Sequence, residues 1–480
     1  MVTEDLIIEE GQREETSSLL NGKKTAKKFK DFERPTPIDK ASDFKYEEFF
    51  FSITDKKSRI AFGNDVFIRL SKYDISEISG QLHKIIRHPD MPRSVFKLFW
   101  DYLKNDKPVV AYVKNLAKDG SYYWVIALAI PTATGYQSIR LKPGSPLFAK
   151  VQQIYDKTLR YEKNMEQQMD KQQAMEASEK YMLGLLKEEG FENYDAFMLH
   201  ALQVEMANRQ SNLKGCSYTV EACNAKNAPT SLIRILKHLT TLFQSLADLN
   251  RIQDALNEHS DYILNLAHSI LLLSLNAQIG STKLDKKDIS LSVVAEKMGE
   301  QSMMGEQQLL TMKDSINELH ELGSKLNFRI IYTKLRIEMA LMFYKEIENG
   351  EADYHGFEYS AEQTIDQLVL SFQPRLKKII KGIGELPGYL LDVITGVQDI
   401  EKFLMVLRFI HITGKVEIAR MNDNSSSFST TFNDLIQEIE TAEVHLKKLS
   451  DVVMSNKDIA NVYANISEQL AQLFEELVRG

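Results

Sequence analysis

The sequence predicts an α+β domain with an antiparallel sheet, followed by a mainly α-helical bundle, or coiled coil, of two long hairpins. Two patterns support this fold class. Between residues 45 and 150, short segments rich in β-branched and aromatic residues alternate with turn signals, as they do in antiparallel sheets. From about residue 151 onward, apolar residues recur at alternating steps of three and four, which is the spacing of packed helices.

Residues 1–44 are polar and charged, so we expect a mobile tail there. The α+β domain follows at 45–145, with helical segments around 64–86 and 92–104. Its strands are expected at "EEFFFSITD", "PVVAYVKNL", "SYYWVIALAIP" and "GYQSIRLKP". The sequence "KDGS" separates the second of these from the third and predicts a hairpin turn.

The helical part is expected to comprise a linker at 146–228, a first hairpin at 229–345 and a second hairpin at 346–480. The linker should begin with one helix over roughly 146–182. The most regular apolar seam holds Ile379, Ile383, Leu386, Leu390, Val393, Val397, Ile400, Leu404 and Leu407. Each hairpin must bury such a seam, and two hairpins of one chain can do so against each other. A homodimer could achieve the same burial, and the sequence leaves both arrangements open.

The composition bounds the class of function. The chain has 480 residues, which suggests about two to four folding units. Its net charge of −8 argues against a nucleic-acid binder, because phosphate contacts need a basic face. No apolar run approaches the roughly 20 residues that span a bilayer, and the acidic N-terminus does not resemble a signal peptide, so a cytoplasmic protein is expected.

No pattern points to catalysis or to a metal site. The sequence "HITGK" at 411–415 lacks the leading glycines of a phosphate-binding loop. The two cysteines, Cys216 and Cys223, do not have a usual metal-ligand spacing, and no histidine pair lies near them. We therefore expect a protein that is not an enzyme and that uses no metal.

The α+β region carries a detailed resemblance to a known family. Its matching stretches are "SITD" (52–55), "RHPDMP" (87–92), "VKN" (113–115), "KDG..YWV" (118–125) and "GYQSIR" (135–140). Together they resemble the PAS domain of bacterial aerotaxis receptors, a family in which this domain binds FAD and the flavin redox state is the signal. The positions that match flavin-associated residues of that family are Asn64, Arg87, His88, Asp90, Phe96, Trp100 and Asn115.

A ligand site in this domain would need flat apolar walls and a few placed polar groups. Five aromatic residues are candidates for the walls: Trp100, Trp124, Tyr122, Tyr123 and Phe96. One position departs from the family, because Val109 follows Pro108 where a tryptophan is usual. FAD is the favoured ligand, an aromatic core that binds nothing is the alternative, and haem is a less favoured third.

The helical part resembles the signalling hairpin of methyl-accepting chemotaxis receptors. The stretch "LNAQIGSTKLDKKDISLSVVA" (275–295) fits the tip of that hairpin in length, and "ITGKVEIARMNDNSSSFSTTF" (412–432) forms an apparent internal repeat of it. The resemblance implies partner-binding tip residues Asn276, Lys283, Asp285, Glu417 and Arg420. Both tips depart from the family's acidic, arginine and glycine pattern, which puts contacts with the chemotaxis kinase and its adaptor in doubt.

Two functions from different classes remain. The first is a cytoplasmic aerotaxis- or redox-sensing protein that signals through its helical bundle. The second is a non-sensory PAS docking or dimerisation protein, whose altered tips bind a partner other than the chemotaxis kinase.

Overall fold

The computed structural model describes residues 34–213, 226–281, 289–351, 354–420, 426–455 and 458–479. The chain forms two compact units. Unit 1 comprises residues 1–237 and 331–376, and unit 2 comprises residues 238–330 and 377–480. In the described part of the chain, no helix combines the length and apolar character needed to cross a bilayer.

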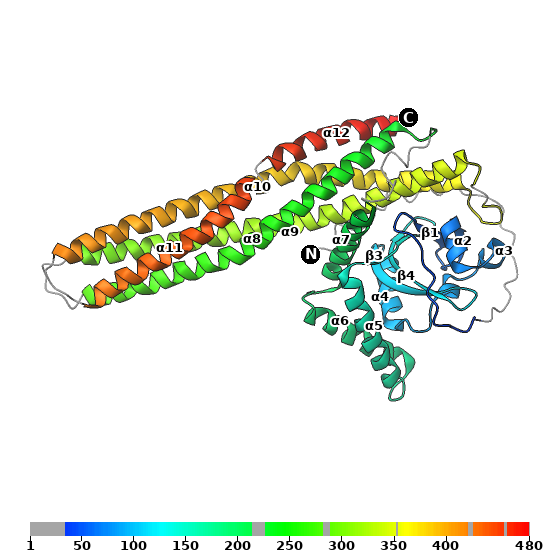
Figure 1. Cartoon of the computed structure of the whole chain (residues 1–480), viewed down its shortest axis with the longest axis horizontal. Helices are drawn as coiled ribbons and strands as arrows, with labels where there is room; N and C mark the ends of the chain where they lie inside the picture. The colour runs from blue at the N-terminus through cyan, green and yellow to red at the C-terminus, as the bar shows by residue number, and fades with distance from the viewer. Residues whose placement is uncertain are drawn as a thin grey trace. The chain divides into compact units, whose positions relative to one another are not determined.

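Unit 1 contains a five-stranded sheet in the order β2-β1-β5-β4-β3, in which all neighbours pair antiparallel (Figure 1). The strands are β1 (Phe50–Asp55), β2 (Ile60–Gly63), β3 (Val109–Leu116), β4 (Tyr122–Pro131) and β5 (Gly135–Leu141). Between β2 and β3 lie the helices α2 (Asp65–Ser71), α3 (Ile75–Ile78), the 3₁₀ helix η3 (His83–Ile86) and α4 (Arg93–Lys104). The α+β fold with an antiparallel sheet is confirmed.

The β3–β4 hairpin turns at the predicted "KDGS". Gly120 adopts a φ of +86°, a conformation that glycine tolerates and other residues rarely adopt. The segment before β1 runs along this hairpin, because the Ile38 N–H donates to the Gly120 carbonyl (2.8 Å) and the Ser42 N–H donates to the Tyr122 carbonyl (2.7 Å). The expected tail therefore ends before Ile38 in the structure, and the residues of 1–33 lie outside the described part.

Three helices follow the sheet in unit 1: α5 (Pro146–Met165), α6 (Lys171–Glu188) and α7 (Tyr194–Leu213). The expectation of one helix over 146–182 is wrong, because α5 ends at Met165 and α6 begins at Lys171, with a non-helical segment at 166–170 between them. Asp170 caps that second helix, and its carboxylate accepts hydrogen bonds from the Gln172 and Gln173 N–H groups (2.8 and 3.0 Å). A capped start of this kind satisfies N–H groups that lack a partner within the helix.

Alternate residues of each strand lie on opposite faces of the sheet. On the outer face, Trp124 packs against Phe148 of α5 (ring centroids 5.4 Å apart). On the inner face, Phe50 packs against Phe67 of α2 (4.8 Å), and Tyr136 packs against Trp100 of α4 (5.3 Å). The inner face is thus covered by the helices that join β2 to β3.

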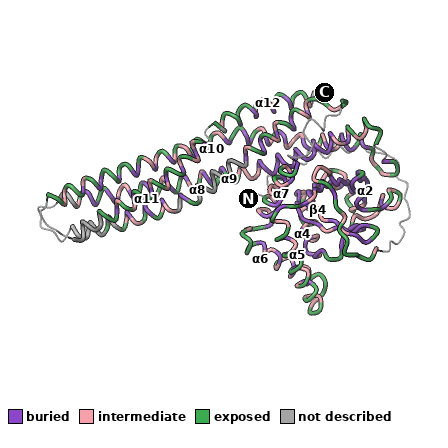
Figure 2. Tube along the Cα trace, viewed as in Figure 1, coloured by how far each residue is buried: buried purple, intermediate pink, exposed green. Residues whose placement is uncertain are grey.

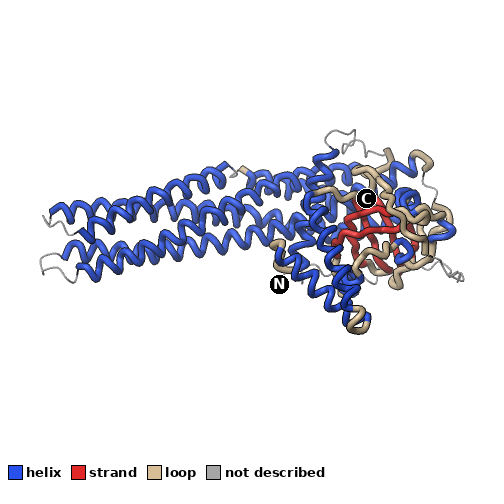
Figure 3. The backbone as a smooth tube through the Cα atoms, turned by 60° about the horizontal axis from the view of Figure 1, so that its bottom comes forward, coloured by secondary structure: helices blue, strands red, loops and turns tan. Residues whose placement is uncertain are grey.

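The long helices are α8 (Thr230–Ser281), α9 (Ile289–Glu348), α10 (Ala361–Arg420), α11 (Ser426–Ser455) and α12 (Ile459–Arg479). In unit 2, α8, α9, α10 and α11 lie side by side (Figures 1 and 3). Tyr262 of α8 stacks on His445 of α11 at 4.2 Å, and the Ser450 hydroxyl of α11 donates to Glu401 of α10 (3.2 Å). The two hairpins therefore pair within one chain.

The predicted apolar seam of α10 is buried in this bundle. Purple stripes of buried residues alternate with exposed ones along the helices of unit 2 (Figure 2). The buried seam residues are Ile379, Ile383, Leu386, Leu390, Val393, Val397, Ile400, Leu404 and Leu407. Burying about nine such side chains, at roughly 1.5–3 kcal/mol each, is what holds a helix of this length against its neighbours.

Candidate functional site

The inner face of the sheet has a floor of small side chains. Ala111 of β3 pairs with Ala127 of β4, and Ala129 of β4 pairs with Ser138 of β5, which in turn pairs with Ser52 of β1. These residues form a strip across four strands, and all are buried. Small side chains let a ligand approach the sheet closely, so this strip and the helices α2 to α4 define the candidate site.

Three buried polar atoms on this face have no hydrogen-bond partner in the described part of the chain. They are Nδ2 of Asn115, the hydroxyl of Tyr123 and the hydroxyl of Ser138. Asn115 and Tyr123 face each other across β3 and β4 in the strand register. A buried polar group without a partner costs about 1–3 kcal/mol, and native proteins leave few of them. A polar ligand would supply the missing partners.

Arg140 of β5 adds a charged side chain to the polar residues of this face. Its side chain is buried, and its guanidinium donates to the Ser52 hydroxyl (2.9 Å) and lies 2.8 Å from Nε2 of His83. The guanidinium also lies over the ring of Phe50, 4.9 Å from its centroid. Sequence reasoning did not single out Arg140, although "GYQSIR" alternates polar and apolar residues and so places Arg140 on one face with Ser138.

Of the five predicted wall residues, Trp100, Phe96 and Tyr123 meet the expectation, whereas Trp124 and Tyr122 lie on the outer face of β4. Trp100 and Phe96 lie on α4, over the inner face. Trp124 lies on the outer face and packs against Phe148 and Tyr155 of α5. The expectation that Trp124 lines the same site as Trp100 is therefore wrong, because residues of β4 alternate between faces and Tyr123, not Trp124, faces inward.

Asn64 has a structural role. Its side-chain oxygen accepts hydrogen bonds from the N–H groups of Phe51 (2.9 Å) and Phe67 (3.1 Å), and its amide donates to the Phe49 carbonyl (2.8 Å). The residue caps α2 and ties that helix to the chain around β1. These three bonds occupy both ends of its amide.

Arg87 and His88 lie beside α4 and β3. The guanidinium of Arg87 stacks on the ring of Phe96 at 3.8 Å, and burial lowers the pKa of Arg87 to about 10. Burial also lowers the pKa of His88 to about 4, with a smaller contribution from the nearby Lys114. His88 is therefore neutral at physiological pH, and its Nδ1 accepts a hydrogen bond from the Asp90 N–H (3.1 Å).

Asp90 lies at the surface. Its carboxylate is 3.0 Å from Nζ of Lys114, and the lysine lowers the pKa of that carboxyl, against the opposing effect of burial. Of the seven predicted residues, the structure thus brings Phe96, Trp100 and Asn115 to the inner face, with Arg87 behind Phe96. Asn64 and Asp90 make local bonds, and the His88 ring accepts a hydrogen bond from the Asp90 N–H.

Two buried glutamates tie the domain to the helices of unit 1, and sequence reasoning missed both. Glu162 of α5 accepts hydrogen bonds from the N–H groups of Arg93 (3.1 Å) and Ser94 (3.2 Å), the first residues of α4. It also accepts from the hydroxyl of Ser178 on α6 (3.0 Å). One carboxylate therefore joins α4, which carries Phe96 and Trp100, to both α5 and α6.

Glu205 of α7 makes a similar junction. It accepts from the N–H groups of Gly144 (2.8 Å) and Ser145 (3.1 Å), from the Ser145 hydroxyl (2.6 Å) and from the hydroxyl of Tyr112 on β3 (2.9 Å). It therefore caps the start of α5 and holds it to the sheet. A negative charge at this end of a helix is favourable, because the N–H groups there lack partners.

One turn further along α7, Arg209 forms a buried ion pair with Glu338 of α9 (2.9 Å). Glu338 also pairs with Lys334, and these two cations lower the pKa of its carboxyl against the opposing effect of burial. Nε of Arg209 donates to the Tyr46 carbonyl (2.8 Å), just before β1. The residues of α9 from 331 to 348 are thus anchored to the sheet domain.

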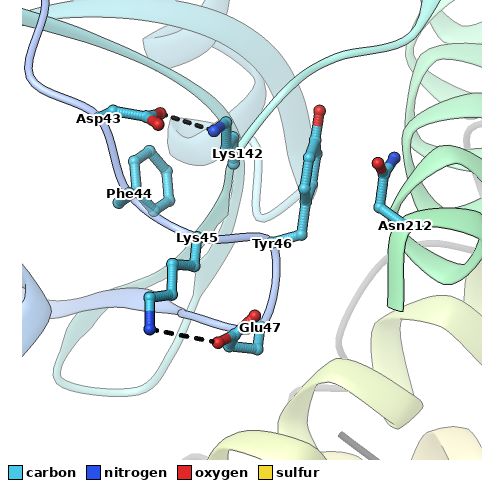
Figure 4. A pocket seen from close by; sticks show the side chains of 7 residues that line it. All are labelled: Asp43, Phe44, Lys45, Tyr46, Glu47, Lys142 and Asn212. Carbon is cyan, nitrogen blue, oxygen red and sulfur yellow. Dashed lines mark ion pairs between the residues drawn. The ribbon is translucent and has the colours of Figure 1, made fainter. Parts of the chain in front are cut away.

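A pocket of about 440 Å³ lies elsewhere in unit 1 (Figure 4). It is lined by Asp43, Phe44, Lys45, Tyr46, Glu47, Lys142 and Asn212. Lys142 pairs with Asp43 (2.6 Å) and Lys45 pairs with Glu47 (3.7 Å), so its cations already have counter-ions. In the described residues, no group of three or more His, Cys, Asp and Glu side chains is arranged to hold a metal ion.

The tip residues are described only in part. Glu417 and Arg420 lie in the last turn of α10, where the guanidinium donates to the carboxylate (2.8 Å). Asn276 lies in α8, but its side chain is not described, and Lys283 and Asp285 lie outside the described residues.

Comparison with known proteins agrees with the fold. A model of the PAS fold matches residues 60–140. The aerotaxis receptor of Escherichia coli (strain K12) is 40% identical over 109 residues, which cover 22% of either chain. The nitrogen fixation regulatory protein of Klebsiella pneumoniae is 27% identical over 74 residues, 15% of either chain. A solved PAS domain from Colwellia psychrerythraea has 18% identity and a TM-score of 0.19, over 20% of this chain and 85% of that one. The matches to the curated relatives span less than a quarter of their length.

Proposed function

We propose that this chain, which carries a PAS domain, is a cytoplasmic sensory protein that binds FAD over the inner face of its sheet. It reports the redox state of the flavin through its helical bundle. The observation that supports this best is the set of three unpartnered polar atoms, on Asn115, Tyr123 and Ser138, beside a strip of small residues. The 40% identity to an aerotaxis receptor over this region favours the same ligand and the same class of signal.

The residues fit a flat ring with polar edges. The side-chain amide of Asn115 and the hydroxyls of Tyr123 and Ser138 would bind the edge of the ring. Trp100 and Phe96 would cover its flat faces, with Arg87 holding Phe96 in place. When bound, the flavin would supply a change of charge and protonation on reduction. His88, which stays neutral, and Asn64 would position the helices around the site.

The signal would leave the site through α4. A ligand edge that changes charge alters the hydrogen bonds it makes, and α4 lies against it through Phe96 and Trp100. Glu162 holds the first N–H groups of α4, so a shift of that helix pulls on α5 and α6. This route replaces the single linker helix expected from the sequence.

Glu205 and Arg209 would carry the shift further. Glu205 joins the start of α5 to α7, and Arg209 on α7 pairs with Glu338 on α9. Because α9 continues as one helix from unit 1 into unit 2, a movement at Glu338 changes the packing of the bundle. Coiled-coil packing with two arrangements would then be the switch.

The first experiment is the absorbance spectrum of the protein purified without added cofactor, recorded before and after reduction. Bound flavin gives a spectrum that bleaches on reduction. A colourless, folded protein would reject the sensor and favour the docking module, whereas a sharp Soret band would move the assignment to haem.

The second experiment compares amide hydrogen exchange of the oxidised and reduced protein. We expect changed protection in α4, at the start of α5 and at residues 331–348 of α9. Identical exchange in both states would reject the route, even for a protein that binds flavin.

The output partner is a separate question. The tips retain Glu417 and Arg420, and a chemotaxis kinase or its adaptor is one candidate for them. A pull-down with these two purified proteins, using Arg420→Ala as the matched variant, would decide whether the second tip binds either. Size-exclusion chromatography with light scattering would report a homodimer.

A further inference from the structure

Two histidines from different hairpins meet inside unit 2. His259 lies on α8 of the first hairpin and His445 lies on α11 of the second, and their Nδ1 atoms are 3.2 Å apart. The two rings pack edge to face, with centroids 5.1 Å apart. His259 is 6% exposed and lies one helical turn before the buried Ile263, so an imidazole occupies a position of the apolar seam. His445 is half-buried and adjoins the buried Leu446.

Tyr262 of α8 completes the cluster around this pair. Its ring stacks on His445 with centroids 4.2 Å apart, and its hydroxyl donates to Glu438 (3.4 Å). The other charged groups that act on His445 are Glu258 of α8 and Lys448 of α11. In the described residues, no hydrogen bond or ion pair joins either imidazole to α9 or α10.

Charged side chains of α9 and α10 have other partners. The carboxylate of Glu306 on α9 lies 3.5 Å from Nδ1 of His268. The carboxylate of Glu401 on α10 accepts a hydrogen bond from Ser450 (3.2 Å). Among the described residues, no carboxylate is therefore bonded to the histidine pair, and a positive charge on the pair would lack a direct counter-ion.

The contact between two Nδ1 atoms limits how many protons the pair can hold. The hydrogen bond needs one ring with its proton on Nδ1 as donor and one ring with a free Nδ1 as acceptor. One added proton can go to Nε2 of the donor ring, which keeps the bond and makes it charge-assisted. A second added proton must go to the accepting Nδ1, so the bond is lost and two like charges face each other.

The surroundings resist the charging of His445. Burial lowers the pKa of His445, and the charges of His259 and Lys448 lower it further. Glu258 opposes these effects. An imidazole in an unfolded chain takes up its proton near pH 6.5. Separated imidazoles therefore bind more protons than the closed pair, and stability that is present above about pH 6.5 is lost as the pH falls.

We propose that His259 and His445 form a pH-sensitive clasp that joins the two hairpins of unit 2. The clasp holds while the pair carries at most one added proton, and it opens when both imidazoles are charged. Opening separates α8 from α11 at this level and so changes the packing of the bundle. Because both histidines belong to unit 2, the clasp acts whether or not unit 1 binds FAD.

Amide hydrogen exchange of the full chain at pH 7.5 and pH 5.5 tests the clasp. Each rate is divided by the intrinsic exchange rate at the same pH, which gives a protection factor for local opening. In the wild type, we expect the protection of residues 258–270 of α8 and 438–449 of α11 to fall by up to about tenfold at pH 5.5. This limit follows because one pH unit below a pKa of about 6.5 the open state gains about tenfold from protonation of one imidazole.

His259→Leu combined with His445→Gln is the test variant, because it keeps an apolar side chain in the seam and a polar one beside it. Its protection in these segments should be the same at both pH values. His268→Asn is the matched control, since it removes an exposed histidine of the same helix. The control should keep the wild-type fall.

Two results would overturn the inference. The first is wild-type protein whose protection in these segments is equal at both pH values, and this result needs no variant. The second is a test variant that lowers the protection by the same factor at both pH values and so keeps the wild-type fall. The histidine pair would then be a structural contact, and the pH dependence would come from other groups.

Discussion

Glu205 is the residue whose removal should disturb unit 1 most clearly. Glu205→Ala takes one carboxylate from four donors: the N–H groups of Gly144 and Ser145 and the hydroxyls of Ser145 and Tyr112. The glutamate is 1% exposed, so water does not replace it readily. We expect unit 1 to lose stability and the start of α5 to lose its cap.

The magnitude follows from the number of groups left without a partner. Each buried donor that loses its acceptor costs about 1–3 kcal/mol. The groups relax in part, since the Ser145 hydroxyl can rotate, so about 3–5 kcal/mol is expected for the whole set. Glu205→Gln keeps one acceptor oxygen but turns an NH₂ group toward the same donors, and about 1–3 kcal/mol is expected for it.

The assay is urea unfolding followed by the fluorescence of the two tryptophans, Trp100 and Trp124, which both lie in unit 1. Glu188→Gln is the matched control, because Glu188 is exposed on the neighbouring α6 and surface changes usually stay within about 0.5 kcal/mol. A Glu205→Ala protein with wild-type stability would refute the role of this carboxylate in holding α5 to α7 and the sheet. It would also refute the part of the proposed signal route that runs from α5 through α7 to α9.

Three further outcomes are expected. Asn64→Ala should lower the free energy of unfolding of the ligand-free protein by about 2–4 kcal/mol, because three backbone groups lose a partner. Asn115→Ala should weaken FAD binding and leave the thermal stability of the ligand-free protein nearly unchanged. Calorimetry of both variants separates the two roles. His88 has a folded pKa of about 4, below the unfolded value of 6.5, so the unfolded state binds more protons between these values. His88 should therefore lower the stability as pH drops from 6.5 toward 4, by at most about 1.4 kcal/mol per pH unit. The pKa of His83 is also lowered by burial, so His83 adds a slope of its own, and His88→Asn should reduce the slope in urea titrations without removing it. Gly305→Ala should destabilise the bundle by about 1–3 kcal/mol, because the added methyl group would clash with an aromatic ring of α10. Gly323 lies in the same helix with open space around it, so Gly323→Ala should stabilise the bundle by up to about 1 kcal/mol. Unfolding followed by helical circular dichroism measures both changes.

The sequence predicted the elements well because their patterns are local. Alternation marked four of the five strands but missed the short β2 (Ile60–Gly63). The heptad spacing marked the seam of α10, which is buried throughout. The break before α6 was missed because "NMEQQMDKQQAME" consists mostly of good helix formers, and only Asp170 signals the new start.

The candidate site was less predictable, because it depends on which face of the sheet each residue occupies. Alternation separates Trp124 from Tyr123, but it does not say which face the helices α2 to α4 will cover. Arg140 and Glu162 are single charged residues among many in the sequence, and only the fold shows that both are buried. The family resemblance identified Asn64, but its three hydrogen bonds to backbone become visible only when β1 and α2 meet.

The pairing of both hairpins within one chain bears on the different sequences of their tips. In a bundle built from two identical chains, any substitution at the tip occurs twice, so one sequence must serve both copies. Here the first tip reads "LDKKDIS" and the second reads "MNDNSSS". Because the two hairpins are encoded separately, each tip can change without altering the other. A partner that binds one tip would then meet a single site on each chain, and Arg420→Ala should abolish binding through the second tip while leaving any binding at the first intact.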